Sequence, residues 1–208
     1  HRLFGAMALV LLVLAACQTA ATPNVTPESS PIPSETAAVT STPTAAGTNW
    51  WDEAVFYEIF VRSFKDSDGD GIGDFQGIIQ QLDYLNDGDP NTTDDLGINA
   101  IWLMPIFPSP SYHGYDVTNY EDVNPDYGTL EDFQQLLEEC HARGIRVIID
   151  FVINHTSDQH PWFKAALDPN SAYHDYYIWS ETKPSGLGPL GQESWFKAPN
   201  GKYYYAVF

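Results

Sequence analysis

The chain of 208 residues holds 9 Lys and Arg against 28 Asp and Glu, which gives a formal net charge of −19. A protein that binds nucleic acid needs Lys and Arg to neutralise phosphates, so this composition argues against a nucleic-acid partner. The acidic, aromatic-rich chain instead favours a neutral ligand or a cation, although solubility alone explains much of the charge.

The first residues predict a secretory signal. Arg2 precedes an apolar run from Leu3 to Ala16. This run is shorter than the about 20 residues that span a bilayer and has the length of a signal-peptide core. It ends in Leu14-Ala15-Ala16-Cys17, which resembles a bacterial lipobox. We therefore expect residues 1–16 to be a signal peptide and Cys17 to carry the lipid of an extracytoplasmic, membrane-anchored lipoprotein. An ordinary cleavage site with an incidental cysteine is the alternative.

Residues 17–48 contain mainly Thr, Pro, Ser and Ala and show no apolar periodicity. Such a composition buries too little apolar surface to order itself. We expect the lipidated Cys17 to be followed by a disordered linker, and the folded part to begin at residue 49.

Strand and helix patterns alternate in the next part of the chain. The patterns predict strands at 54–60, 98–104 and 145–153 and helices at 75–85 and 130–143, with a polar loop at 87–95. This order predicts parallel strands with right-handed crossovers. A doubly wound sheet and a (β/α)8 barrel both begin this way, but no Gly-x-Gly-x-x-Gly follows the first strand, so a dinucleotide site loses support.

The third strand pattern is a β-branched apolar run, typical of a strand that is buried on both faces. It ends in Asp150, Asn154 and His155, at the end of a parallel strand where α/β proteins gather ligand-binding groups. A core strand with solvated last residues is the alternative. Cys140 falls in the preceding helix pattern, and we expect it to be a buried free thiol.

Residues 156–208 have a different composition, rich in Trp, Tyr, Phe, Pro and Gly. Asn200-Gly201 between two aromatic runs predicts a β-hairpin, so we expect a partial, inserted β-rich domain after the third strand. The foldable part has about 160 residues, against about 250 in a complete barrel. We therefore expect the sequence to be incomplete at both ends.

An acidic loop follows the first strand pattern. Asp66, Asp68, Asp70 and Asp74 occupy positions 1, 3, 5 and 9 of a Gly-rich turn, and Ile72 at position 7 would offer its backbone carbonyl. Ca²⁺ takes 6–8 such oxygens, whereas unneutralised carboxylates would repel each other. The loop departs from an EF-hand because position 12 is a glycine and a strand is expected before it. Plain Asp-Gly turns are the alternative.

The segment after the second strand contains His113, Tyr115 and Asp116. In a barrel it would be a loop on the catalytic face. The Tyr115 ring suits the apolar face of a sugar, and the other two side chains can hydrogen-bond hydroxyl groups. Taken alone, a surface loop with a packed tyrosine is the simpler interpretation.

Four motifs together resemble the N-terminal part of an α-amylase of glycoside hydrolase family 13. The resemblance covers residues 50–208 and rests on Phe56–Phe64 with the acidic loop, His113–Asp116, Tyr127–Phe133 and Asp150–His155. The lipobox and the 87–95 loop look most like bacterial lipoprotein α-amylases near the oligo-1,6-glucosidase and neopullulanase groups.

The resemblance implies a fold and roles for individual residues. The fold would be α/β: strands 1–3 of a (β/α)8 TIM barrel at 49–155 and the start of domain B at 156–208. Tyr115 would stack on a glucose ring, and His113 and His155 would hydrogen-bond its hydroxyls. Asp150 would support these residues without itself contacting the sugar. The acidic loop would hold Ca²⁺, and Asn154 a second Ca²⁺.

The resemblance also implies a retaining hydrolysis of α-1,4-glucans such as starch and maltooligosaccharides. Its nucleophile, acid/base and third carboxylate follow later strands of the barrel, so we expect them beyond residue 208 and expect the fragment to be inactive. Alternatives are an α-glucosidase, neopullulanase or glucan transferase of the same family, and a glucan-binding lipoprotein without activity.

Overall fold

The computed structural model describes residues 49–206. The expected signal peptide, the lipidation site at Cys17 and the linker therefore lie outside the described residues. Within residues 49–206, no helix is long and apolar enough to cross a membrane.

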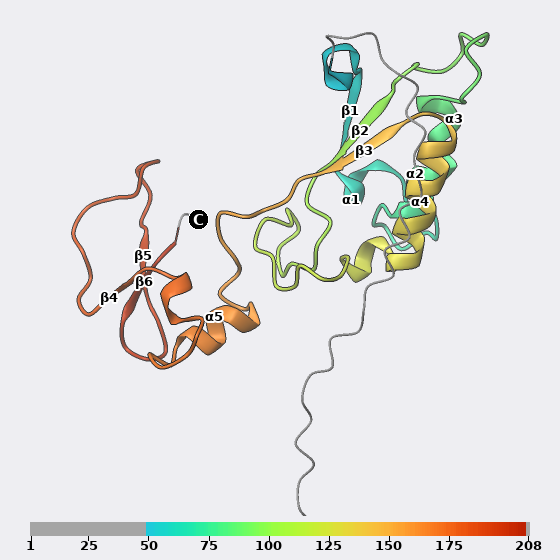
Figure 1. The fold of residues 1–208 in the computed structure, drawn as a ribbon. Helices are drawn as coiled ribbons and strands as arrows, with labels where there is room; N and C mark the ends of the chain where they lie inside the picture. Colours follow the sequence, from blue (N-terminus) through green and yellow to red (C-terminus); the bar gives the residue numbers. More distant parts are fainter. Residues whose placement is uncertain (1–48, 207–208) are drawn as a thin grey trace, which may run out of the picture. The chain divides into compact units, whose positions relative to one another are not determined.

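A parallel sheet organises the first part of the described chain (Figure 1). Strands β1 (Phe56–Ile59), β2 (Ala100–Leu103) and β3 (Arg146–Ile149) follow one another in the order β1-β2-β3, with β2 in the middle. Tyr57 is in register with Ile101, and Ile101 with Val147. The predicted order of strands and the parallel pairing are confirmed.

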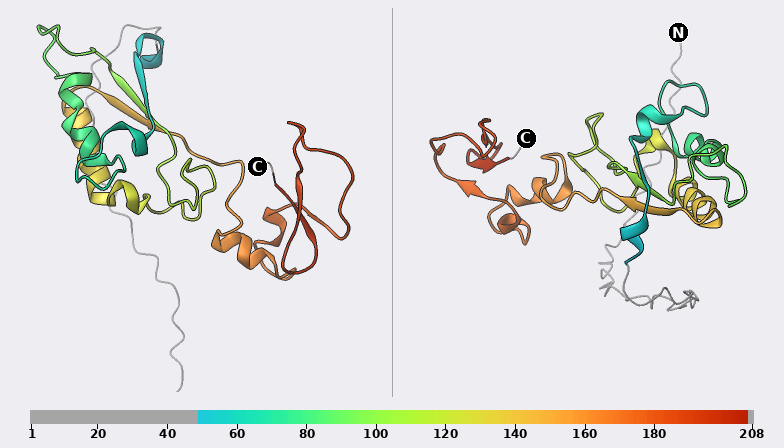
Figure 2. Two further views of the ribbon diagram at one scale, coloured as in Figure 1. Left: turned by 180° about the vertical axis from the view of Figure 1, so that it is seen from behind. Right: turned by 90° about the horizontal axis from the view of Figure 1, so that it is seen from above.

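Helices cover one face of this sheet (Figures 1 and 2). They are α2 (Phe75–Gln80), α3 (Leu82–Leu85) and α4 (Leu130–Ala142), while the single turns α1 (Val61–Phe64), η1 (Trp50–Glu53) and η2 (Pro125–Tyr127) lie in the connections. Helix α4 starts where its sequence predicts, because Thr129 Oγ1 accepts from Asp132 N and the Asp132 carboxylate accepts from Thr129 N. Gly144, with a φ of 73°, follows its C-terminus.

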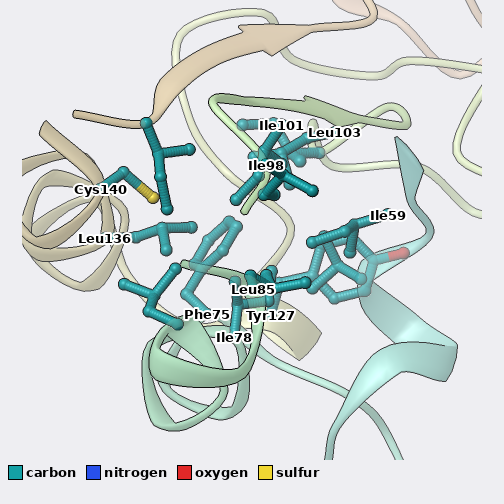
Figure 3. Close-up of a cluster of buried hydrophobic side chains, with 14 of the residues drawn as sticks. Ile59, Phe75, Ile78, Leu85, Ile98, Ile101, Leu103, Tyr127, Leu136 and Cys140 are labelled. Atoms are coloured by element: carbon teal, nitrogen blue, oxygen red, sulfur yellow. The ribbon is translucent and has the colours of Figure 1, made fainter. Parts of the chain in front are cut away.

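The core lies between the sheet and the helices (Figure 3). Side chains from the strands and from α2, α3 and α4 are fully buried there, among them Ile59, Ile101, Leu103, Phe75, Ile78, Leu85 and Leu136. Burial of each such side chain stabilises the fold by about 1.5–3 kcal/mol. Cys140 is a buried free thiol, as expected, and burial raises its pKa to about 12.

Three local expectations are wrong. The helix predicted at 75–85 is interrupted at Gln81, whose φ of −109° and ψ of 4° are not helical. The third strand ends at Ile149 and is exposed rather than buried on both faces, with Ile148 at 38% and Ile153 at 81% exposure. The helices cover only one face of the sheet, so side chains on the other face are exposed, including Trp102 of the central strand at 37%, which is in register with Ile148. The acidic loop is preceded by the helical turn α1 rather than directly by a strand.

The later residues form a second, antiparallel sheet. Its order is β4-β6-β5, from β4 (Trp179–Ser180), β5 (Trp195–Lys197) and β6 (Tyr203–Tyr205). The predicted hairpin is confirmed, and Gly201 in its turn has a φ of 89°. Helix α5 (Pro161–Ala166) and the turn η3 (His174–Tyr176) are additional to the expected β structure. His160 caps α5 through Nδ1, which accepts from Trp162 N, and Pro161 occupies its first position.

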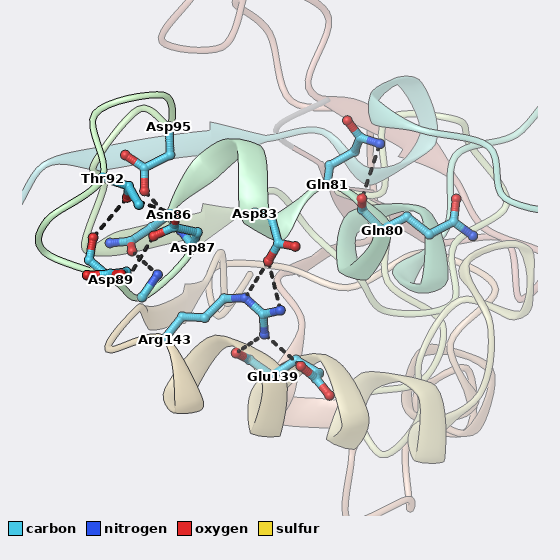
Figure 4. A network of polar contacts seen from close by, with 11 residues as sticks. Gln80, Gln81, Asp83, Asn86, Asp87, Asp89, Thr92, Asp95, Glu139 and Arg143 are labelled. Atoms are coloured by element: carbon cyan, nitrogen blue, oxygen red, sulfur yellow. Dashed lines mark hydrogen bonds and ion pairs between the residues drawn. The ribbon is translucent and has the colours of Figure 1, made fainter.

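Polar contacts fix the helices and the 87–95 loop (Figure 4). Arg143 at the end of α4 donates to Asp83 of α3 over 3.1 and 2.9 Å and to the Glu139 carboxylate over 2.6 Å. In the loop, Asp87 Oδ1 accepts from Asp89 N, and Asp89 Oδ1 accepts from Asn91 N. The predicted loop is thus confirmed, and its own carboxylates order its backbone.

Candidate functional site

Tyr115 is the meeting point of the residues that the sequence singled out. It lies in the loop after β2, and Asp150 directly follows β3. The Tyr115 hydroxyl donates to Asp150 Oδ2 over 2.8 Å. Because both residues come after the carboxyl ends of neighbouring parallel strands, the sheet itself brings them together.

Two histidines hold the backbone of the same tyrosine. His155 Nε2 lies 2.9 Å from the Tyr115 carbonyl oxygen, and Tyr115 N donates to His113 Nδ1 over 3.2 Å. A carbonyl oxygen only accepts, so His155 carries a proton on Nε2. A backbone N–H only donates, so Nδ1 of His113 is an acceptor and its neutral ring carries the proton on Nε2.

The hydrogen bonds of His155 bear on its expected role. Besides the bond from Nε2, its Nδ1 lies 3.2 Å from Asn154 Nδ2. Both ring nitrogens thus have protein partners, and a sugar hydroxyl would have to replace one of these bonds. The direct contact of His155 with sugar stays a prediction, and the observed contact is with Tyr115.

The electrostatics of Tyr115 favour the neutral phenol. Burial, the hydrogen bond to Asp150 and the negative charges of Asp150 and Glu58 raise its pKa to about 12. The hydroxyl is therefore a stable hydrogen-bond donor at any physiological pH, and the ring orientation is tied to Asp150.

Asp116 supports the loop that carries His113 and Tyr115. Its Oδ1 accepts hydrogen bonds from Ser109 Oγ and Ser111 Oγ. Burial alone would raise the pKa of Asp116, but the hydrogen bonds to its carboxylate, led by those from Ser109 and Ser111, together with its interaction with His113, outweigh burial and the pKa is lowered. The sequence suggested that Asp116 could hydrogen-bond sugar hydroxyls, and in the structure its carboxylate instead accepts hydrogen bonds from serines of its own loop.

Tyr120 belongs to the site although the sequence did not single it out. Its hydroxyl lies 2.7 Å from the carbonyl oxygen of Val152 and 2.7 Å from that of His155. A lone tyrosine in a loop carries no spacing signal that sequence reasoning can use. Only the fold reveals that it reaches the segment after β3.

A cavity of about 840 Å³ borders these residues. Its lining includes four predicted site residues, His113, Tyr115, Asn154 and His155. It is mainly aromatic and apolar with a few polar groups, which is the common character of a small-molecule site.

The acidic loop gathers part of the predicted metal ligands. Carboxylate oxygens of Asp66, Asp68 and Asp74 lie within 4.8 Å of one another. Backbone N–H groups of Gly69 and Gly71 donate to Asp66 and lower its pKa, so its carboxylate stays charged.

The remaining predicted ligands are less well placed. Asp70 Oδ1 accepts from Ile72 N over 2.7 Å and is not one of the three grouped carboxylates. Asn154 is exposed and follows β3. The roles of Asp70, Ile72 and Asn154 as metal ligands therefore stay predictions.

Two glycines, Gly73 in the acidic loop and Gly77 in α2, let the loop and the start of α2 lie directly against the backbone of α1 and Lys65. A Cβ at Gly73 would lie 2.1 Å from the Val61 carbonyl oxygen, and one at Gly77 would lie 1.9 Å from that of Lys65. Ca²⁺ takes oxygen ligands, with carboxylates prominent among them. Three converging carboxylates on a loop backed by rigid structure fit this ion.

Known proteins resemble the chain over most of the described part. Residues 58–208 match the family described as "Alpha amylase, catalytic domain". Alpha-amylase 3 of Dictyoglomus thermophilum is 54% identical over 160 residues, covering 76% of this chain and 30% of that protein. The probable oligo-1,6-glucosidase 2 of Bacillus subtilis is 47% identical over 165 residues, covering 76% and 28%.

A solved structure agrees in fold as well as in sequence. The crystal structure of the alpha-amylase from H. orenii superposes with a TM-score of 0.69 and 61% identity, covering 74% of this chain and 32% of that one. The fold is thus that of the N-terminal part of a glycoside hydrolase barrel. The chain belongs to the α-amylase family, glycoside hydrolase family 13, and spans about 30% of the length of the curated relatives described above.

Proposed function

We propose that the chain is the N-terminal part of a retaining glycoside hydrolase of α-amylase type that acts on α-1,4-glucans. The observation that carries this proposal is the fixed Tyr115, held by Asp150, His113 and His155 beside the cavity. The 61% identity to an α-amylase supports it.

The described residues would bind and orient a glucose ring. The Tyr115 ring offers an apolar face to the ring's C–H groups, and Nε2–H of His113 is a donor for a hydroxyl. A retaining mechanism uses two carboxyl groups about 5–5.5 Å apart on either side of the scissile bond. We assign no carboxylate of this chain to those roles.

The test is the product pattern of the full-length protein on maltoheptaose. An α-amylase releases maltooligosaccharides of several lengths early in the reaction, with the α-anomeric configuration retained. Glucose as the only early product would contradict endo-action. A matched Tyr115→Ala variant should raise KM and lower kcat/KM by at least tenfold, because stacking on the sugar is lost.

An α-1,6-glucosidase is a second candidate, supported by the 47% identity to the B. subtilis relative. Isomaltose separates the two, because an α-amylase does not cleave it. Transfer is separated from hydrolysis by products longer than the substrate. A protein that binds maltoheptaose but cleaves neither sugar would favour the glucan-binding lipoprotein.

We further propose that the acidic loop holds Ca²⁺, with the grouped carboxylates of Asp66, Asp68 and Asp74 as its support. The ion would neutralise these charges and fix the loop. Calcium-dependent melting of the protein tests this proposal.

We also propose that a lipid on Cys17 tethers the protein to the outer face of a membrane. The lipobox-like sequence supports this. Metabolic labelling with radioactive palmitate in a bacterial host should mark the protein and should fail to mark the Cys17→Ser variant. Labelling of both would contradict the anchor.

A further inference from the structure

Tyr120 connects two parts of the site through a single hydroxyl group. It lies in the loop after β2, while the two carbonyl oxygens that its hydroxyl contacts, those of Val152 and His155, follow β3. The hydroxyl has one proton to share between two acceptors at 2.7 Å. This arrangement ties both ends of the segment 152–155 to one point.

The tied segment carries His155, whose ring in turn holds Tyr115. His155 Nε2–H donates to the Tyr115 carbonyl oxygen over 2.9 Å. The hydrogen bonds therefore run from Tyr120 through the backbone of His155 to its ring and on to Tyr115. Loss of the first contact releases the backbone on which the second depends.

We propose that Tyr120 is a positioning residue of the glycan site, which sets the orientation of Tyr115 by holding His155 so that its Nε2–H reaches the Tyr115 carbonyl. This rests on the proposed function, because Tyr115 is the residue expected to contact the sugar. Tyr120 itself touches no substrate in this scheme.

The ring of Tyr120 is fixed well enough for this role. It packs against Phe107 with ring centroids 5.5 Å apart, against Phe151 at 5.8 Å and against His160 at 5.6 Å. Burial raises the pKa of its hydroxyl, so the group remains a donor. A phenyl ring at this position would keep the packing and lose only the hydroxyl.

The experiment compares Tyr120→Phe with the unchanged full-length protein. The lost hydrogen bond is worth about 1 kcal/mol, so we expect kcat/KM on maltoheptaose to fall about fivefold, mainly through a higher KM. Tyr84→Phe, an exposed tyrosine of α3, is the matched control and should leave kcat/KM unchanged. An unchanged kcat/KM in Tyr120→Phe would overturn the proposal.

A second measurement is independent of activity. In protein labelled with ¹⁵N-histidine, NMR should show the His155 proton on Nε2 and its slow exchange with water. The His155→Gln variant identifies the signal. In Tyr120→Phe we expect the exchange of this proton to accelerate at least fivefold. If the protein cleaves no α-glucan, the proposed function fails while this measurement still tests Tyr120. An unchanged exchange rate with a native melting temperature would overturn the positioning role alone.

Discussion

The Tyr115 hydroxyl donates a 2.8 Å hydrogen bond to Asp150 Oδ2, across 35 positions of sequence. The contact joins the loop after β2 to the end of β3. The Tyr115 ring is held through its hydroxyl, while His113 and His155 hold the backbone N–H and carbonyl of the same residue, so its position is fixed before any ligand binds. Such a preformed surface lowers the entropy lost on binding.

Asp150→Asn tests the electrostatic part of this contact. Burial is the largest cause of the raised pKa of Tyr115, about 12, and the Asp150 charge adds to it. We expect the pKa to fall in the variant without reaching the ordinary value. Because the pKa of Tyr115 is higher in the folded protein than in the unfolded chain, the protonated phenol stabilises the folded state. This contribution is fully present below about pH 10 and is lost as pH rises toward 12.

The measurement is a titration of ¹³C-labelled tyrosine, with Tyr115→Phe to identify the signal. An unchanged Tyr115 pKa in Asp150→Asn would show that the carboxylate does not influence the phenol.

Calcium should stabilise the protein through the acidic loop. At a free concentration about 100 times Kd, an ion that binds only the folded state adds about 2.7 kcal/mol. Asp68→Asn should abolish this increment, since it removes one of the grouped carboxylates. Calorimetric melting with Ca²⁺ and with EDTA is the measurement.

The 87–95 loop supplies the matched control for calcium. Asp89→Asn changes a carboxylate that accepts from Asn91 N in a similar turn but is not grouped with others. It should leave the calcium increment intact. Asp70→Ala then tests the additional predicted ligand, and a full increment in that variant would remove Asp70 from the site.

His160 should make the protein sensitive to acid. Its buried ring has a pKa lowered by burial, and its Nδ1 caps α5. A lowered histidine pKa means that its stability contribution is present above about pH 6.5, the ordinary value, and is lost as pH falls below it. His160→Asn keeps a capping acceptor without a titrating ring.

The free energy of unfolding measured from pH 8 to pH 5 should fall less steeply in His160→Asn than in the unchanged protein. His141→Asn, at an exposed position of α4, should keep the original slope. Equal slopes in all proteins would reject the role of His160.

Arg143→Ala should destabilise the contact between α3 and α4. Its partners Asp83 and Glu139 are 76% and 42% exposed, so solvent screens both pairs and the total loss should be about 1 kcal/mol at low salt. Chemical unfolding at low and high salt is the measurement, and the loss should shrink at high salt. Lys183→Ala, at an exposed ion pair with Glu193, should cause no measurable change.

Short sequence motifs correctly predicted the helix start and the hairpin turn, because neighbouring residues form both. Thr129 with Asp132 marks the start of α4, and Asn200-Gly201 marks the hairpin. The break at Gln81 has no such signal, because neither glycine nor proline marks it. The exposure of Ile148 could not be predicted from its apolar pattern either, since burial depends on what covers each face of the sheet.

The candidate site was predictable in its residue types and less so in its contacts. Motif resemblance located Tyr115, Asp150 and His155, and parallel strands explain why they meet. That His155 contacts the Tyr115 backbone, and that Tyr120 braces His155, depends on the paths of two loops. Loop paths follow from long-range packing, which sequence patterns do not encode.

Asp74 serves two structures at once. Its Oδ2 accepts from Ser67 within the acidic loop, and its Oδ1 accepts from Gly77 N at the start of α2, whose Phe75 and Ile78 fill the core. If the loop holds Ca²⁺ as we propose, a substitution at this position would change metal affinity and helix stability together. In that case a change of calcium affinity that leaves α2 intact would have to come from substitutions at Asp66 or Asp68.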